Sequence, residues 1–177
     1  MSIQSRNYRS PLGWLELSAA NGELLTIKFV KTPRSNANAR ARVLEEACLQ
    51  LDAYFSGNRR HFSVPFRLEG SEFEKSVWKE LTQTEYGKLT TYSELAKHLG
   101  SPRAARAVGN ALGKNRLPII IPCHRVVSRN SLGGFTGGLE IKRFLLQLEG
   151  ITTFEKDNVP PIRRLSGQFL RSFSSPT

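Results

Sequence analysis

Reactive side chains follow a short apolar run in the second half of the chain. Ile119–Ile121 are three β-branched residues, Pro122 follows them, and Cys123, His124 and Arg125 come next. The isoleucines predict a short buried strand, which the proline ends because it has no N–H to give to a sheet. A cysteine where the chain leaves a rigid element is held in position, as a reactive group must be.

Cys123 would attack carbon as a thiolate, and a free cysteine has a pKa of about 8.5. A neighbouring Arg125 and a basic environment would lower that pKa. So would a histidine–carboxylate relay, for which the chain offers His124 and Glu149. Another interpretation stays open, because a lone cysteine near apolar residues is commonly a small packed side chain. Packing is also the role expected of Cys48.

The charge of the chain points to a polyanionic partner. The 177 residues carry a net charge of +11, which makes nucleic acid the first candidate, although a solvated basic surface would give the same total. From Ala96 to Leu139 there are seven Lys and Arg residues and no Asp or Glu. A stretch of one sign around the candidate cysteine favours nucleic acid binding.

Several classes of protein are disfavoured. No apolar run approaches the roughly 20 residues of a membrane span, and the first residues lack the apolar segment of a signal peptide. Two cysteines do not make a disulfide framework and suit a reducing compartment. We therefore expect an intracellular protein, cytoplasmic or, in a eukaryote, nuclear. No CxxC or HxxxH pair is present, so no metal site is expected.

The first part of the chain predicts a small unit of strands and one helix. Residues 8–30 have the apolar pattern of strands, and Asn21-Gly22 is a hairpin signal between them. Residues 32–38 predict a loop, Arg40–Phe55 has helical spacing, and residues 59–66 predict one more strand.

A mainly helical unit is expected to follow. The capping boxes Ser71-x-x-Glu74 and Thr91-x-x-Glu94 each predict the start of a helix. Phe73, Val77 and Leu81 form the apolar stripe of the first helix. A third helix is expected from Pro102 to about Leu112, with Ser101 as its N-cap.

The second and third of these helices are short and joined by a glycine turn, which is typical of a helix-turn-helix. Gly109 lies inside the third helix, where glycine costs about 1 kcal/mol relative to alanine. Small residues here favour close approach to a nucleic acid backbone, and close packing between helices is the alternative.

A last helix is expected over Leu139–Glu149, after a glycine-rich loop, with Ile141, Phe144, Leu145 and Leu148 on its buried face. The chain is therefore predicted to be α+β, with a scaffold domain at residues 1–70 and a functional domain at residues 71–150. Residues 151–177 are expected to form an extended or disordered basic tail.

Several motifs together resemble one family. Residues 122–126 read Pro-Cys-His-Arg-Val, which is similar to the active-site signature of the O6-alkylguanine–DNA alkyltransferases. The resemblance includes residues 92–96, 102–109, 115–118, 137–142 and 149–150, and more weakly residues 10–17 and 53–55. It implies a ribonuclease H-like domain followed by a winged-helix-like domain that contains the helix-turn-helix.

The resemblance implies a direct repair reaction. Cys123 would take an alkyl group, typically methyl, from O6-alkylguanine or O4-alkylthymine in one irreversible displacement, without a cofactor or a metal. Each molecule would act once. His124 and Glu149 would act together, with a water between His124 and the thiol. Tyr92 would donate a proton to the leaving base, and Asn115 would brace the active-site turn.

The substrate pocket that the resemblance implies comprises Pro118, Val126, Phe135, Thr136 and Gly137. The carbonyl groups of Cys123 and Val126 would accept hydrogen bonds from the exocyclic amine of guanine, and the Thr136 N–H would reach O6. Phe135 stands where tyrosine is common in the family, in a loop that is shorter by one residue. Tolerance for bulky adducts is therefore an open question.

The implied partner is double-stranded DNA, bound through the minor groove with little dependence on sequence. The protein would bind as a monomer, with cooperative binding left open. The damaged base must leave the stack, and Arg106 would fill the gap. The expected DNA contacts are Tyr92, Ser93, Arg103, Ala104, Ala105, Arg106, Gly109, Lys114 and Arg125.

Two other functions stay open. A cysteine hydrolase would use Cys123, His124 and a carboxylate with repeated turnover, but the predicted DNA-binding helices count against it. A DNA-binding module without chemistry would not need Cys123, so the presence of that cysteine counts against this second alternative.

Overall fold

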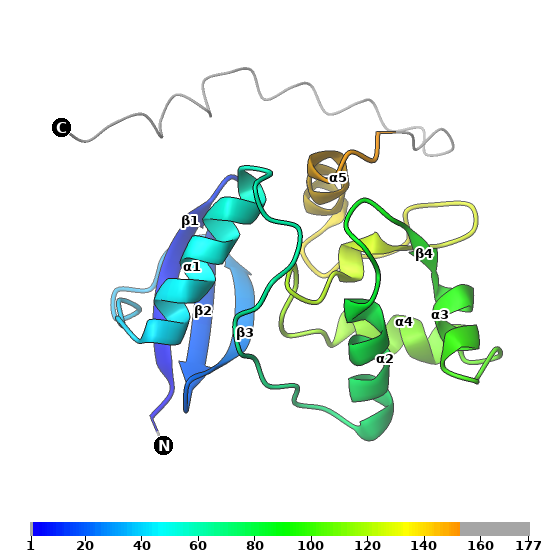
Figure 1. The fold of residues 1–177 in the computed structure, drawn as a ribbon, viewed down its shortest axis with the longest axis horizontal. Helices are drawn as coiled ribbons and strands as arrows, with labels where there is room; N and C mark the ends of the chain where they lie inside the picture. Colours follow the sequence, from blue (N-terminus) through cyan, green and yellow to red (C-terminus); the bar gives the residue numbers. More distant parts are fainter. Residues whose placement is uncertain (1, 153–177) are drawn as a thin grey trace.

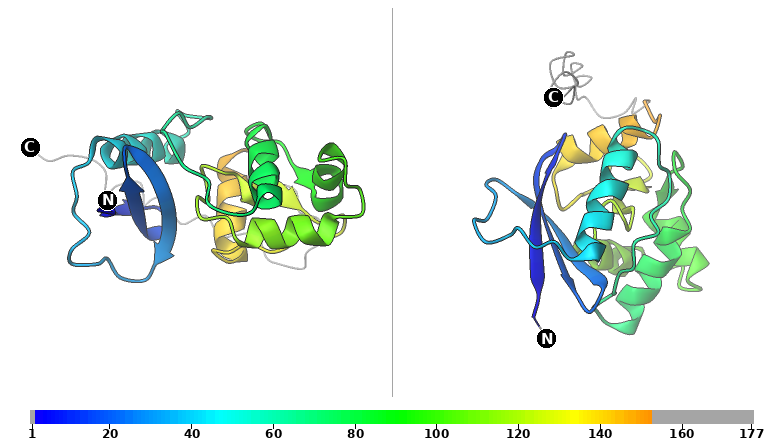
Figure 2. Two further views of the ribbon diagram at one scale, coloured as in Figure 1. Left: turned by 90° about the horizontal axis from the view of Figure 1, so that it is seen from below. Right: turned by 60° about the vertical axis from the view of Figure 1, so that its left-hand side comes forward.

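The computed structural model describes residues 2–152, so the tail predicted for residues 151–177 falls almost entirely outside the described part of the chain. Within that part the fold is α+β, as predicted. A three-stranded antiparallel sheet and one helix come first, and a mainly helical part follows (Figure 1). The two parts lie side by side in Figure 1 and in the left-hand view of Figure 2. No helix in residues 2–152 combines the length and apolar character that a membrane span requires.

The sheet is built from strands β1 (Gln4–Ser10), β2 (Gly13–Ala20) and β3 (Glu23–Val30) in that order. Asn21 and Gly22 have φ values of 55° and 78°, and a tight hairpin between right-twisted strands requires positive φ at both positions. The hairpin prediction is therefore confirmed. Helix α1 (Arg42–Phe55) covers one face of the sheet. The buried side chains between them include Leu15, Leu17, Leu44 and Leu51.

The strand predicted at residues 59–66 is wrong. Phe66 makes a single bridge to Leu24, and no strand extends from it. Pro65 cannot donate to a ladder. In addition, the side-chain oxygen of Gln50 accepts the N–H groups of Ser63 and Val64 at 2.8 and 3.2 Å, so those groups cannot bond to a strand.

Both predicted capping boxes are present. Helix α2 (Glu72–Thr82) begins after Ser71, and helix α3 (Tyr92–His98) begins after Thr91. The Trp78 indole donates to the Ala111 carbonyl at 2.9 Å and ties α2 to helix α4 (Ala105–Gly113). Val77 and Leu81 are fully buried as predicted. Phe73, the third member of the stripe, is 36% exposed because it lies in the first turn, at the edge of the packed face.

The third helix begins three residues later than predicted. The Ala104 N–H donates to the Ser101 carbonyl at 2.8 Å and closes a turn around Pro102 and Arg103. Proline is favoured at the second position of such a turn as well as at the first position of a helix. Ser101 therefore does not cap α4, whose N-cap Ala104 makes no side-chain cap bond.

The three isoleucines are buried, but they do not form a strand. Ile119 has a φ of 77°, and Pro118 and Ile121 form one isolated bridge. The chain turns here and enters a 3₁₀ helix, η1 (Cys123–Arg125). An apolar run alone does not distinguish a buried strand from a buried turn. A short parallel pair does form nearby, between β4 (Thr90–Thr91), which precedes this segment, and β5 (Val126–Val127), which follows it.

Helix α5 (Leu139–Leu148) differs from its prediction in the face that it buries. Leu145 is buried as expected, whereas Ile141, Phe144 and Leu148 are half-buried. The other buried members are Lys142, Arg143 and Leu146. The helix packs on its two sides, and one of them covers the loop that follows Cys123. The buried surface of the helix therefore includes the polar side chain of Lys142, which the apolar pattern alone did not single out.

Candidate active site

Cys123 lies at the start of η1 and is 6% exposed. The side chain of Asn115 fixes its position. One carboxamide group donates to the Cys123 sulfur at 3.1 Å and to the Ile121 carbonyl at 3.0 Å, while its oxygen accepts from the Leu117 N–H at 2.9 Å. The turn that carries the thiol is thus held from both ends by one buried side chain.

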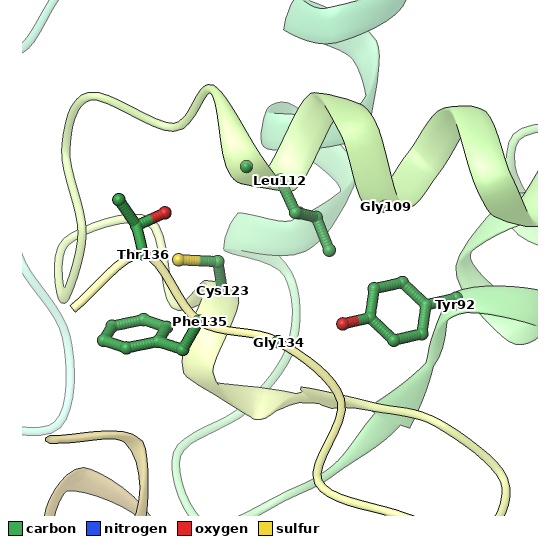
Figure 3. A pocket seen from close by; sticks show the side chains of 8 residues that line it. Tyr92, Gly109, Leu112, Cys123, Gly134, Phe135 and Thr136 are labelled. Atoms are coloured by element: carbon green, nitrogen blue, oxygen red, sulfur yellow. The ribbon is translucent and has the colours of Figure 1, made fainter. Parts of the chain in front are cut away.

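The sulfur borders a cavity of about 260 Å³. Helix α4 forms one wall, the loop at residues 134–136 forms another, and Tyr92 stands at one end. Figure 3 shows the Cys123 sulfur pointing toward Thr136, and the Tyr92 hydroxyl pointing into the pocket from the opposite end. The cavity therefore has a thiol at one end and a phenol at the other, with an aromatic side chain, Phe135, beside the thiol.

The five residues predicted for this pocket do not all line it. Phe135 and Thr136 line it, whereas Pro118 lines a neighbouring groove. Val126 is fully buried. Gly137 packs so tightly that an added Cβ would lie 2.9 Å from the Phe135 ring and 3.0 Å from the Phe29 ring.

Next to Cys123 in the chain, His124 forms a fully buried pair with Glu149. Their Nε2 and Oε1 atoms are 2.9 Å apart, and both side chains have no exposure. The other ring nitrogen of His124, Nδ1, is buried and has no partner within the described residues. A buried polar atom without a partner is unusual and indicates a place for a water or a proton.

The Glu149 carboxylate is shared by several donors. Arg125 donates through Nε and Nη2, each at 2.9 Å. The Tyr54 hydroxyl donates to Oε1 at 2.8 Å, and the Gly87 N–H donates to Oε2 at 3.1 Å. Burial raises the pKa of Glu149, but the bonds from His124 and Arg125 outweigh it and lower the pKa to about 2. This carboxylate is therefore ionised throughout the neutral range.

The thiol itself is not ionised in the free protein. Burial raises the pKa of Cys123 to about 11, against the opposing effects of the Asn115 hydrogen bond and the Lys142 charge. The expectation that Arg125 lowers this pKa is wrong, because its guanidinium faces Glu149 instead. Burial also lowers the pKa of His124, against the effect of Glu149, so its imidazole is neutral and able to accept a proton.

Lys142 is a functional candidate that the apolar pattern of α5 did not reveal. Its side chain is fully buried, and Nζ donates to the carbonyl groups of Val126 at 2.6 Å, Gly134 at 3.2 Å, and Leu132. Burial lowers its pKa to about 8. This ammonium group joins α5 to both sides of the loop that lines the pocket. The signal that could have predicted the burial of Lys142 is its position three residues before Leu145, which places it beside that buried side chain on the helix.

The residues predicted to contact DNA fall into exposed, half-buried and buried groups. Ser93, Arg103 and Arg106 are exposed, and Lys114 is exposed and paired with Glu74. Those that are half-buried are Tyr92, Ala104, Ala105 and Gly109. Arg125 is 5% exposed and engaged with Glu149, so the prediction that it contacts DNA is wrong.

We expect Tyr54→Phe to lower the free energy of unfolding by about 1.5–3 kcal/mol, because a buried carboxylate loses one of its donors. Denaturant unfolding at neutral pH measures the loss. Tyr8→Phe is the matched control, since Tyr8 donates to the more accessible carboxylate of Asp52 at 2.7 Å. The control should lose less. Equal losses would contradict a special dependence of Glu149 on Tyr54.

The pKa of Cys123 predicts a pH dependence of stability. It is raised from 9.0 to about 11 on folding, so the folded state holds the proton more tightly. The resulting stability is fully present below pH 9 and is lost as the pH rises toward 11. The stability difference between wild type and Cys123→Ala should therefore change by on the order of 2 kcal/mol across that range. A constant difference would contradict the raised pKa.

Comparisons with known proteins agree with this geometry. Residues 4–68 match the family model described as 6-O-methylguanine DNA methyltransferase, ribonuclease-like domain, and residues 72–151 match that of the DNA binding domain. The methylated-DNA–protein-cysteine methyltransferase of Haemophilus influenzae is 42% identical over 164 residues, which cover 87% of this chain and 91% of the relative. The protein of that name from Methanosarcina acetivorans is 42% identical over 149 residues, 81% of this chain and 96% of the relative.

Solved structures show the same similarity. The O6-methylguanine methyltransferase of Mycobacterium tuberculosis matches with a TM-score of 0.76 at 37% identity, over 84% of this chain and 93% of that chain. OGT of the same organism in complex with DNA matches with a TM-score of 0.75 at 38% identity, over 83% and 93%. Matched over most of its length in sequence and in fold, the chain belongs to the family of 6-O-methylguanine DNA methyltransferases.

Proposed function

We propose that this protein repairs O6-alkylguanine in double-stranded DNA by moving the alkyl group to the sulfur of Cys123, once per molecule. The observation that carries the proposal is the combination of a buried acid–base pair and a cavity at the thiol. His124, the residue after Cys123, is paired with the buried Glu149, and Cys123 lines a cavity of about 260 Å³ bordered by helix α4. The names of the relatives support the same reaction. O4-alkylthymine is a second substrate in this proposal.

The first step is loss of the thiol proton. Because burial holds the pKa of Cys123 near 11, the thiol requires a base at neutral pH. The unpartnered Nδ1 of His124 is that base, reached through one water. Glu149 stabilises the resulting imidazolium through its bond to Nε2. Asn115 donates to the sulfur and so favours the thiolate.

The second step is the displacement. A bond forms between the Cys123 sulfur and the alkyl carbon, while the bond from that carbon to O6 breaks. The leaving guanine receives a proton from the Tyr92 hydroxyl, which points into the cavity. Tyr92 then takes a proton from water and His124 releases to water the one it took from the thiol, so the transfer ends with both groups neutral. The product is a thioether that no group in the site could cleave, so the reaction ends there.

Recognition of guanine would use backbone groups near the thiol. The carbonyl groups of Cys123 and Val126 would accept from the exocyclic amine, and the Thr136 N–H would donate to O6. Lys142 already donates to the Val126 carbonyl at 2.6 Å, so this oxygen would be shared through its second lone pair.

Double-stranded DNA is the partner, bound by a monomer through its minor groove with little dependence on sequence. Support comes from the exposed Arg103 and Arg106 near the start of α4 and from the small residues beside them. The damaged nucleotide leaves the stack to reach the cavity, and Arg106 fills the gap. Cooperative binding is left open.

The chain divides at Gly70-Ser71 into a scaffold domain and a DNA-binding domain, and its location is intracellular.

The central test uses a duplex with a radiolabelled methyl group on guanine O6. We expect label to move to Cys123 and to saturate at about one per protein, because nothing regenerates the thiol. Peptide mapping locates the label. Transfer by Cys123→Ala, or many turnovers per molecule, would overturn the proposal.

A second test separates DNA insertion from chemistry. Arg106→Ala should slow repair in duplex DNA while leaving the reaction with the free base O6-methylguanine unchanged, since Arg106 lies outside the cavity lining. Lys97→Ala removes an exposed charge from α3 and serves as the control. If Arg106→Ala slows both reactions equally, the arginine supports the fold rather than the DNA.

A further inference from the structure

A groove of about 570 Å³, the one that Pro118 lines, is a second hollow beside the Cys123 cavity. It lies between strand β3 and the segment at residues 113–118, so each half of the chain contributes one side. Gly113 and Thr136 line both hollows. Because the Cys123 sulfur points toward Thr136 (Figure 3), the two spaces meet on the side of the thiol away from Tyr92.

The second hollow is cationic. None of its lining residues is acidic, and Lys28, Lys114 and Arg116 carry positive charge. Lys114 is paired with Glu74, and Arg116 is paired with Glu69 at 3.0 Å. Lys28 is exposed and makes no ion pair with any residue of the described range.

The acid nearest to Lys28 in the sheet register is Glu16, its direct neighbour on β2. Glu16 is 4% exposed and faces Arg34, with a nitrogen–oxygen separation of 3.5 Å. Its ion pair is with Arg34, and no ion pair joins it to Lys28. Among the three cations that line the groove, Lys28 is therefore the one without an ion pair in the described residues.

Aromatic surface leads from the thiol to this groove. Phe135 lines the Cys123 cavity and Phe29 lines the groove, and their rings meet edge to face with centroids 6.2 Å apart. Such a wall suits an aryl group. Thr136 lies between the two spaces, so the groove concerns adducts that extend beyond the Cys123 cavity.

We infer that the groove receives the far end of extended O6 adducts and favours adducts that end in a carboxylate. The inference rests on the proposed function and adds a substrate class to it. In the reaction the sulfur–carbon bond forms and the carbon–O6 bond breaks. Guanine leaves with the electron pair and takes a proton, and the arm with its carboxylate stays on Cys123, beside Lys28.

The test compares two free bases of similar size and opposite charge, O6-(4-carboxybenzyl)guanine and O6-(4-aminomethylbenzyl)guanine. Free bases remove DNA binding from the comparison. The carboxybenzyl compound should react about fivefold faster, as expected for one partly exposed charge pair. The preference should shrink in about 1 M salt, which screens such a pair.

Lys28→Glu should reverse the preference. Lys31→Glu is the matched control, because it makes the same charge change three residues away, outside the groove, and it should leave the preference unchanged. Equal rates for the two compounds, or equal effects of the two variants, would overturn the inference if methylated DNA is still repaired. Failure of all three proteins to accept methyl from DNA would instead overturn the proposed function.

Discussion

The Glu149 carboxylate is the interaction on which the rest of the site depends. Placed just after α5, it receives donors from three separate parts of the fold: the end of α1, the loop before β4, and η1. A buried charge is tolerated only when it is paired and hydrogen-bonded. These donors make Glu149 a fixed anion, and a fixed anion gives His124 one orientation. The orientation in turn leaves Nδ1 as the free end of the imidazole.

Two further buried polar side chains fix the remaining walls. Asn115 holds the turn before Cys123, and Lys142 holds the loop after it. The turn contains one isolated bridge, and the loop has ladder pairing only at its start, where β5 pairs with β4. Ile119 has a positive φ in that turn, which a β-branched residue adopts only when its surroundings impose it. The site is thus irregular backbone held in place by side chains.

Local signals in the sequence predicted much of the fold. Asn21-Gly22 and the capping boxes at Ser71 and Thr91 act through neighbouring residues, so their outcome does not depend on tertiary contacts. The strand at residues 119–121 was wrong because burial and strand pairing are different properties, and the sequence carries a signal for burial alone. The strand at residues 59–66 was wrong for another reason. Gln50 accepts the N–H groups of Ser63 and Val64, and this tertiary contact has no local signal in the sequence.

The hydrogen bond between Tyr54 and Glu149 joins residues 95 positions apart. During synthesis Tyr54 is made long before Glu149, so this bond cannot form until most of the second half of the chain has been added. Contacts of such long range slow folding. The same delay means that a nascent chain exposes Cys123 before the acid–base machinery behind it exists. The thiol therefore gains its selective reactivity only as α5 docks and brings Glu149 into place.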